Sequence, residues 1–178
     1  MIKNLTLSLL FIANALNLFS KAHFEISPID VSSLNNPTSR IDVSGFRYEQ
    51  TDYLVIQPKI NAESYLTSNN IKVETYLGDG YYLVSTIASN TVSSLQKLQS
   101  AQVGYLKPED KIYEGLKSST SNSNPVTVLF AGSVSDEIIQ AAAQTIGFSI
   151  NKIDAKNHHF TATVNKIQME KISKLPFV

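Results

Sequence analysis

The sequence predicts an α+β protein made of two consecutive units of order β-α-β-β-α-β, the second of which lacks its last strand. Three observations predict this class. Short apolar runs alternate with stretches in which apolar residues recur at helical spacing. Turn-forming residues such as glycine, asparagine and proline bound these segments. The whole pattern then occurs a second time at a nearly constant offset along the chain.

The first unit is expected at residues 51–107. Its strands are short apolar runs or alternate apolar and polar residues, and they are expected at 53–57, 71–77, 81–86 and 103–106. The segments with helical spacing lie at 62–68 and 90–100. Gly78-Asp79-Gly80 supplies the turn between the two middle strands. This order of elements is that of the ferredoxin-like split βαβ fold.

The second unit is expected at residues 125–178, after a linker at 108–124 that ends in a polar tract rich in serine and asparagine. Its strands are expected at 126–130, 148–153 and 160–164.

Two helices are expected in this second unit. Ser133 is expected to cap the first of them, and Gly147 to end it. The buried face of this helix follows a four-residue spacing, at Val134, Ile138, Ala142 and Ile146. Asn165 is expected to cap the last helix, whose apolar residues are Met169, Ile172 and Leu175.

The hairpins and last helices of the two units superpose at an offset of 77 residues, which places Leu83 on Phe160. Before the hairpin the offset is about 73. At 77 residues the fourth strand of the first unit, which opens at Val103, falls beyond Val178. We therefore expect a truncated second unit in a chain that is the front piece of a longer protein. The alternative is a natural three-stranded variant.

Residues 1–22 have the pattern of a secretory signal peptide. A cationic start precedes an apolar run at 5–13, and Ser20 and Ala22 are the small residues of a cleavage site. The run is too short to span a membrane as an anchor. We therefore expect an exported protein, periplasmic or extracellular, without a membrane span in its mature chain. A polar arm at 23–50, without a core of its own, would follow the cleavage site.

The overall composition restricts the classes of function. Fifteen Lys+Arg balance 15 Asp+Glu, so the chain lacks the basic character of a nucleic-acid-binding protein. It has no cysteine, which excludes disulfides, thiolate metal sites and cysteine nucleophiles. We expect no nucleic-acid partner and no cofactor.

Apolar and turn residues in both units match a known pattern. In the first unit they are Tyr53-Leu54-Val55-Ile56-Gln57, Tyr76-Leu77-Gly78-Asp79-Gly80-Tyr81-Tyr82-Leu83-Val84 and Val103-Gly104-Tyr105-Leu106-Lys107-Pro108-Glu109-Asp110-Lys111-Ile112. In the second unit they are Ile172-Ser173-Lys174-Leu175-Pro176-Phe177-Val178. Over roughly residues 50–178 the chain thereby resembles the N-terminal propeptide region of secreted bacterial subtilisin-like (S8 family) serine proteases, with tandem repeats of fervidolysin-like type.

The resemblance implies a role without catalysis. Such propeptides help the protease domain that follows them to fold, and they inhibit it. Their sheet packs on the protease, and the segment after the last strand occupies the substrate cleft. The resemblance thus implies a folding aid and inhibitor whose partner is a subtilisin-like protease domain, in cis or in trans. The parent protein would be a serine endopeptidase.

No catalytic, cofactor-binding or metal-binding residue is expected in this chain. The Asp, His and Ser motifs of a subtilisin-type triad are missing, and Asp79-Gly80 is explained by the hairpin turn. His158 and His159 are expected to be adjacent strand residues that point to opposite faces, so they cannot readily bind one metal ion. Phosphate-binding glycine motifs are absent as well.

Three other interpretations were weighed against the propeptide. Tyr76, Tyr81 and Tyr82 suggest a platform on which bases of single-stranded nucleic acid stack, but the surrounding sequence is not basic and sheet packing explains them. A stand-alone secreted protein-binding or adhesion module is the main alternative. A small periplasmic enzyme that depends on His158 or His159 is the third.

Overall fold

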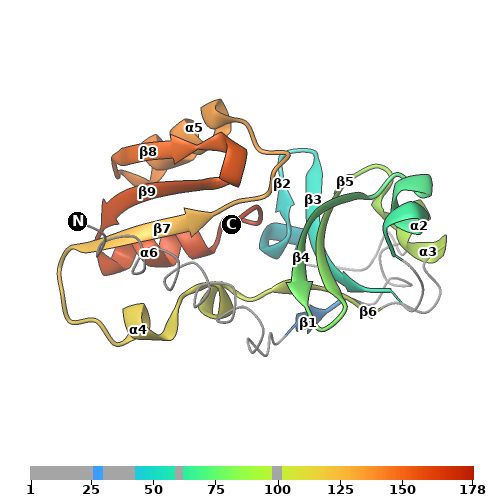
Figure 1. Ribbon diagram of the computed structural model, residues 1–178, viewed down its shortest axis with the longest axis horizontal. Helices are drawn as coiled ribbons and strands as arrows, with labels where there is room; N and C mark the ends of the chain where they lie inside the picture. The colour runs from blue at the N-terminus through green and yellow to red at the C-terminus, as the bar shows by residue number, and fades with distance from the viewer. Residues whose placement is uncertain (1–25, 30–42, 59–61, 98–101) are drawn as a thin grey trace, which may run out of the picture.

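The computed structural model describes residues 26–29, 43–58, 62–97 and 102–178. The predicted signal peptide and much of the predicted arm lie outside these residues. The described chain has an α+β fold with two antiparallel sheets and short helices. One sheet lies at each end of the molecule, and the C-terminus lies between them (Figure 1).

The first sheet contains six strands. They are β1 (Ile26–Pro28), β2 (Arg47–Tyr48), β3 (Thr51–Gln57), β4 (Lys72–Gly78), β5 (Tyr81–Ile87) and β6 (Gln102–Leu106). Their order is β1-β6-β3-β5-β4, with β2 paired to β3 as a hairpin. All these pairs are antiparallel. Helix α2 (Ala62–Ser68) follows β3, as predicted, and α3 (Thr91–Lys97) follows β5.

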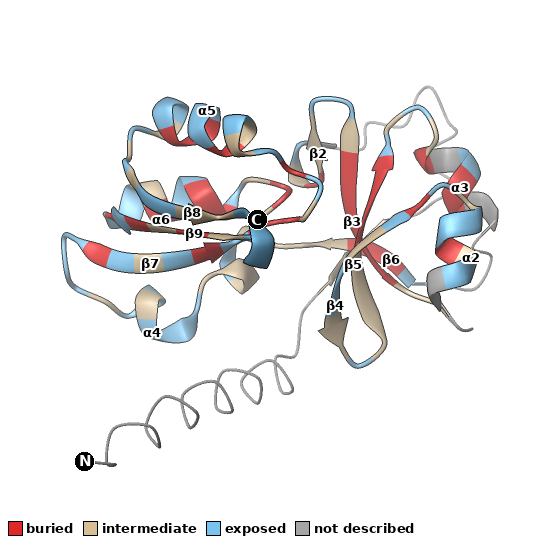
Figure 2. Ribbon diagram, turned by 45° about the horizontal axis from the view of Figure 1, so that its top comes forward, coloured by how far each residue is buried: buried red, intermediate tan, exposed pale blue. Residues whose placement is uncertain are grey.

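Helices α2 and α3 cover the face of the first sheet that points away from the second sheet (Figures 1 and 2). Because strand residues alternate between faces, Leu54, Ile56 and Val84 point to the helices. There they form a core with apolar residues of both helices and of the neighbouring segments, namely Phe46, Leu66, Ile71, Leu95 and Val103. Phe46 belongs to the predicted polar arm and is fully buried. The arm therefore adds to the first core as well as supplying β1 and β2.

The second sheet has three antiparallel strands in the order β7-β9-β8. They are β7 (Asn124–Leu129), β8 (Ile150–Asp154) and β9 (His159–Val164). Helices α5 (Asp136–Ile146) and α6 (Lys166–Ser173) lie on one face, behind the sheet in Figure 1. Their core with the sheet is formed by Val128, Phe160, Ala162, Val164, Ile139, Ala142, Met169 and Ile172.

The helix ends of the second unit confirm two predictions and correct one. Gly147 ends α5 with φ of 87°, and Asn165 caps α6 through a reciprocal capping box with Gln168. Ser133 does not cap α5, whose N-cap position is held by Ser135. The backbone N–H of Ser133 instead donates to a side chain of the first unit, which keeps it out of the helix.

The predicted linker contains two helical turns, η4 (Pro108–Lys111) and α4 (Glu114–Lys117). Ile112 and Leu116 in this segment pack against the second core. The polar tract that follows is exposed up to Asn124 except for a half-buried Ser119. The segment at 108–117 thus packs on the second unit, because its few apolar residues find a core beside them.

The predicted offset of 77 residues does not preserve the faces of the strands. Phe160 points to the helices of its unit, whereas Leu83 lies on the opposite side of β5 from the helix-facing Val84. An odd offset reverses the face of a residue when both strands keep the same pairing. In the helices the offset holds, since Leu95 and Ile172 are both buried.

Candidate functional site

The C-terminal segment of the second unit packs on the face of the first sheet that the helices leave free. Phe177 is fully buried there, with its ring centroid 4.9 Å from that of Tyr48 and 6.1 Å from that of Tyr53. Both contacts are edge-to-face, which is a favourable geometry for aromatic pairs. Residues 52–56 of β3 are buried as a result, since one face meets helices and the other meets Phe177 (Figure 2).

A buried carboxylate adds a polar contact between the two units. The side chain of Glu74 in β4 is 1% exposed, and its Oε2 accepts the backbone N–H of Ser133 at 2.9 Å. Its Oε1 accepts the Ser85 hydroxyl and lies 3.6 Å from Lys72 Nζ. Both oxygens therefore have donors, as a buried carboxylate requires.

Tyr53 lies close to this carboxylate. Burial raises the pKa of its hydroxyl, and the negative charge of Glu74 acts in the same direction. A hydrogen bond with the Ser133 side chain opposes the shift. Tyr53 is therefore a neutral packing residue between the two units at ordinary pH.

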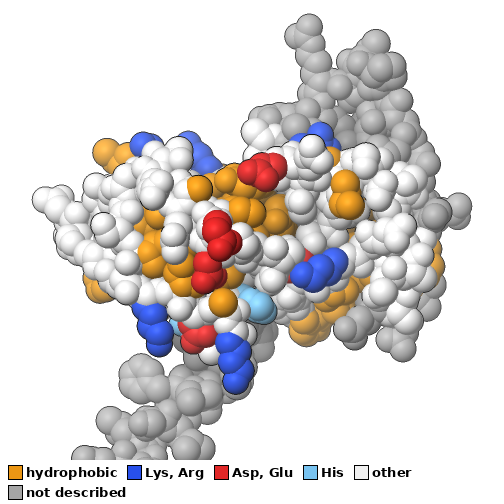
Figure 3. Space-filling view, turned by 90° about the horizontal axis from the view of Figure 1, so that it is seen from above, with side chains coloured by type: hydrophobic (Ala, Val, Ile, Leu, Met, Phe, Trp, Pro, Cys, Tyr) orange, Lys and Arg blue, Asp and Glu red, His pale blue; other side chains and the backbone are white. Residues whose placement is uncertain are grey.

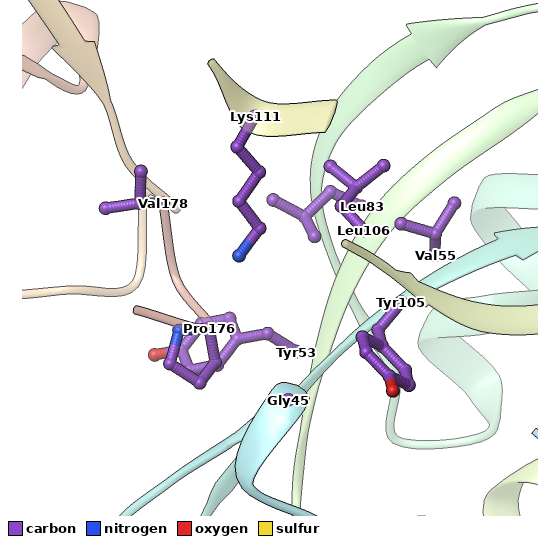
Figure 4. Close-up of a pocket in the computed structure, with 9 residues that line it drawn as sticks. All are labelled: Gly45, Tyr53, Val55, Leu83, Tyr105, Leu106, Lys111, Pro176 and Val178. Carbon is purple, nitrogen blue, oxygen red and sulfur yellow. The ribbon is translucent and has the colours of Figure 1, made fainter. Parts of the chain in front are cut away.

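Lys111 forms a third contact near this interface. It points from η4 into the space between the C-terminal segment and β5 (Figure 4), and its Nζ donates to the carbonyl oxygen of Leu175 at 2.8 Å. Burial lowers the pKa of Lys111 to about 8 because the ammonium group loses solvation. The remaining space is about 10 Å³, which holds one water molecule at most. The site thus has no room for a substrate.

Asp52 is a second buried carboxylate, and it lies within the first unit. The guanidinium group of Arg47 binds both of its oxygens, and the Thr91 hydroxyl donates to Oδ2 at 2.6 Å. The same contact raises the pKa of Arg47. The three residues join the β2-β3 hairpin to the start of α3, which indicates a structural role.

The residues considered for catalysis or metal binding do not converge. Asp79 lies between two glycines in the β4-β5 turn, and all three have positive φ. His158 precedes β9 and adopts a left-handed conformation with φ of 51°, so the prediction that both histidines are strand residues is wrong for His158. His159 opens β9 and is half-buried. Within the described residues, no three His, Asp or Glu side chains are grouped as metal ligands.

The three tyrosines do not form one platform. Tyr76 and Tyr82 pack together with ring centroids 5.1 Å apart. Tyr81 points to the other face, where its hydroxyl donates to Gln102. Basic and acidic side chains are interspersed on the face seen in Figure 3, where hydrophobic side chains gather over the middle. A continuous basic surface of the kind that binds nucleic acid is not seen on this face.

The second sheet leaves one face free of helices. Pro125, Thr127, Leu129 and Thr163 are exposed on it, and Thr161 lies opposite Thr127. These side chains are uncharged and short apart from Leu129, which is 51% exposed. A flat surface of this kind, without a pocket, can bind a protein partner by packing.

No protein-family model matches this chain, and no curated protein of known function is significantly similar to it in sequence. Among the helices of the described ranges, none combines the length and apolar character that crossing a membrane requires. Sequence analysis missed the interface of Glu74, Lys111 and Phe177. A Pro-Phe pair after the last helix was its only visible signal.

Proposed function

We propose that the chain is the N-terminal propeptide region of a secreted subtilisin-like serine protease and consists of two ferredoxin-like units. The order of the strands carries the proposal. In the first sheet β6-β3-β5-β4 is the order 4-1-3-2 of a split βαβ unit, with helices after its first and third strands. In the second sheet β7-β9-β8 repeats the order of the first three strands. Tandem units of this kind agree with the sequence resemblance.

The exposed surfaces support a role in binding instead of catalysis. The free face of the second sheet offers uncharged side chains such as Thr127 and Thr163 to a partner. The buried polar groups Glu74 and Asp52 have hydrogen-bond partners within the chain, so neither is held ready for a reaction. In this proposal the chain acts on a protease domain by packing against it, which favours the folded form of that domain.

Refolding in trans tests the proposal. A bacterial subtilisin-like catalytic domain, produced without its own propeptide, is unfolded and then diluted with or without residues 23–178 of this chain. We expect the chain to increase the activity recovered after it is digested, and to inhibit the native domain when added to it. Unchanged recovery and unchanged activity at excess chain would contradict the proposal.

Two matched variants locate the surface in this experiment. Thr163→Arg places a charge on the free face of the second sheet, whereas Gln144→Arg places one on the exposed side of α5. We expect Thr163→Arg to abolish both effects and Gln144→Arg to retain them. Equal loss in both variants would argue against packing through the sheet.

A stand-alone secreted binding module is the second candidate. The observation in its favour is that the two units bury Phe177 and Glu74 between them without any partner. Such a module would unfold cooperatively by itself and leave the subtilisin-like domain unaffected. The same refolding series therefore separates the two candidates.

A further inference from the structure

The outer strand edges of the two sheets differ in their protection. The free side of a strand pairs readily with another chain, and proteins usually block it with bulges, proline or short strands. β4 and β8 have irregular registers, and β1 is three residues long and contains Pro28. β7 instead pairs with β9 over six consecutive residue pairs without a shift. Its only such device is Pro125.

The backbone groups on the outer side of β7 can be assigned from the ladder. The N–H of Phe130 donates to the carbonyl of His158, on the side of β9. Inward and outward hydrogen-bonding groups alternate along a strand, so Val128 and Val126 also face β9. The N–H and C=O groups of Thr127 and Leu129 therefore point outward. Within the described parts of the chain neither N–H has a backbone acceptor, and both residues are exposed.

The next outward position already has an extended neighbour. The N–H of Ala131, two residues beyond Leu129, donates to the carbonyl of Phe177 at 2.8 Å. Backbone of the C-terminal segment thus lies beside the end of this edge and pairs with it once. The geometry of the edge is therefore compatible with a strand that continues along Leu129 and Thr127.

The first sheet provides the precedent for the occupant. There the outer side of β3, the first strand of its unit, is covered by β6. β6 pairs antiparallel with β3 over three residue pairs, from Val55 to Gln57, and buries Val103 against the helix-side core. The free stretch of β7 is of similar length. Neither Thr127 nor Leu129 carries a charge that would repel an apolar strand.

We propose that the outer edge of β7 binds an extended segment of another polypeptide, antiparallel to β7 and with apolar residues at alternate positions, as in β6. Backbone hydrogen bonds to Thr127 and Leu129 would supply the affinity, as in other cases of strand addition. One set of alternate side chains would extend the core of α5 and α6, and the other would cover Leu129. The edge would accept such a strand whether or not the chain serves a protease.

Amide hydrogen exchange of the mature chain, followed by NMR, tests this assignment. The probe is a synthetic peptide with the sequence of residues 101–107, Ala-Gln-Val-Gly-Tyr-Leu-Lys. We expect saturating peptide to slow exchange at Thr127 and Leu129 by at least about tenfold, with no change along β4 or β8. Absence of protection at millimolar peptide, or protection along β4 or β8 instead, would overturn the proposal.

Two control peptides, N-methylated at odd or at even positions, test the pairing itself. A strand has only one edge that faces β7, so we expect one control to lose binding and the other to keep it. Equal binding of both would show that backbone pairing is not involved. Protection that grows with protein concentration in the absence of peptide would show a second copy on the edge, and would overturn the proposed occupant.

Matched variants test the side chain that the added strand covers. Leu129→Lys and Thr163→Lys both place a lysine on the same exposed face of the sheet, but Thr163 lies on the central strand β9. We expect Leu129→Lys to weaken peptide binding by about tenfold and Thr163→Lys to leave it nearly unchanged. The reverse order would contradict binding at the edge and indicate the sheet face. The outcome is independent of subtilisin refolding, so the two proposals can fail separately.

Discussion

The first strands of the two units, β3 and β7, have equivalent neighbours along the chain and different neighbours in space. β3 lies between β5 and β6, with helices on one face and Phe177 on the other. β7 has a strand on one side only, and its second face is exposed. A common strand order therefore leaves one unit enclosed and the other with a free face and a free edge. Packing in the first unit and binding in the second follow from this difference.

The largest expected effect is on the contact that joins the two regions. Phe177→Ala removes a fully buried ring that packs on Tyr48 and Tyr53, and we expect a loss of about 4 kcal/mol in the free energy of unfolding. Because few other contacts join the units, the single unfolding transition should separate into two. Differential scanning calorimetry and urea denaturation measure both effects.

Ile167→Ala is the control for this variant. Ile167 also lies in the second unit but is 65% exposed, so we expect a change within about 0.5 kcal/mol. A Phe177→Ala protein that unfolds in one transition at the wild-type midpoint would show that the units are not coupled through this ring.

The next largest effect is confined to the first unit. Asp52→Asn keeps the shape of the side chain but leaves the Arg47 guanidinium without its buried counter-charge. We expect a loss of about 3 kcal/mol, since removing one member of a buried pair leaves the other uncompensated. Urea denaturation gives the loss, and amide exchange in β9 should stay as in the wild type.

Lys72→Gln is the matched control for the ion pair. The Lys72 side chain is 59% exposed and lies 3.6 Å from Glu74, so solvent screens its charge and we expect almost no change in stability. Equal losses in Asp52→Asn and Lys72→Gln would contradict the distinction between the buried and the exposed pair.

Lys111 gives a pH-dependent effect of opposite sign. Its pKa is about 8 in the folded chain against 10.5 for a free side chain, so the unfolded chain binds more protons between these values. Stability should therefore rise with pH across this window, by about 3 kcal/mol in total. Lys111→Met removes the buried charge and should abolish the rise. At pH 7 it should stabilise the protein by about 2 kcal/mol after loss of the bond to Leu175.

Urea denaturation of both proteins at several pH values from 7 to about 10.5 checks this effect. The difference between the two proteins matters here, because tyrosines also titrate near the upper limit. Parallel pH profiles in the wild type and Lys111→Met would mean that Lys111 is hydrated in the folded protein.

The smallest effect tests the second unit alone. Asn165→Ala removes the side chain that accepts the Gln168 N–H and begins α6. We expect a loss of about 1 kcal/mol, typical of an N-cap, with amide exchange accelerated in α6 and unchanged in β3. Ser135→Ala is a useful comparison because Ser135 holds the N-cap position of α5 without a side-chain hydrogen bond. Its loss should be smaller, and an equal loss would argue against the capping box.

Most elements of the fold could be predicted because their signals are local. The helix at 62–68 has the predicted bounds, and Gly147 and Asn165 end and begin helices as expected. Turn chemistry, capping and apolar periodicity act between residues that are close along the chain. The absence of a predicted catalytic site rested on missing motifs, and the scattered positions of Asp79, His158 and His159 are in keeping with it.

The interface could not be predicted, because its signals are long-range. Glu74 and Ser133 are 59 residues apart, and Lys111 and Leu175 are 64 apart. Nothing next to Glu74 in the chain indicates that its carboxylate is buried. Ser133 resembles a helix cap by sequence, but the donor that it would have left free is used by the other unit.

Local chemistry was thus enough to set the strands, helices and turns, since hydrophobic spacing and backbone preferences belong to neighbouring residues. Tertiary structure alone decided which faces and edges are covered. Leu83 and Phe160 occupy similar places in their hairpins, yet one packs between the units and the other beneath helices. The edge of β7 stays free for the same reason. Burial depends on what packs against a strand, and that is a property of the assembled chain.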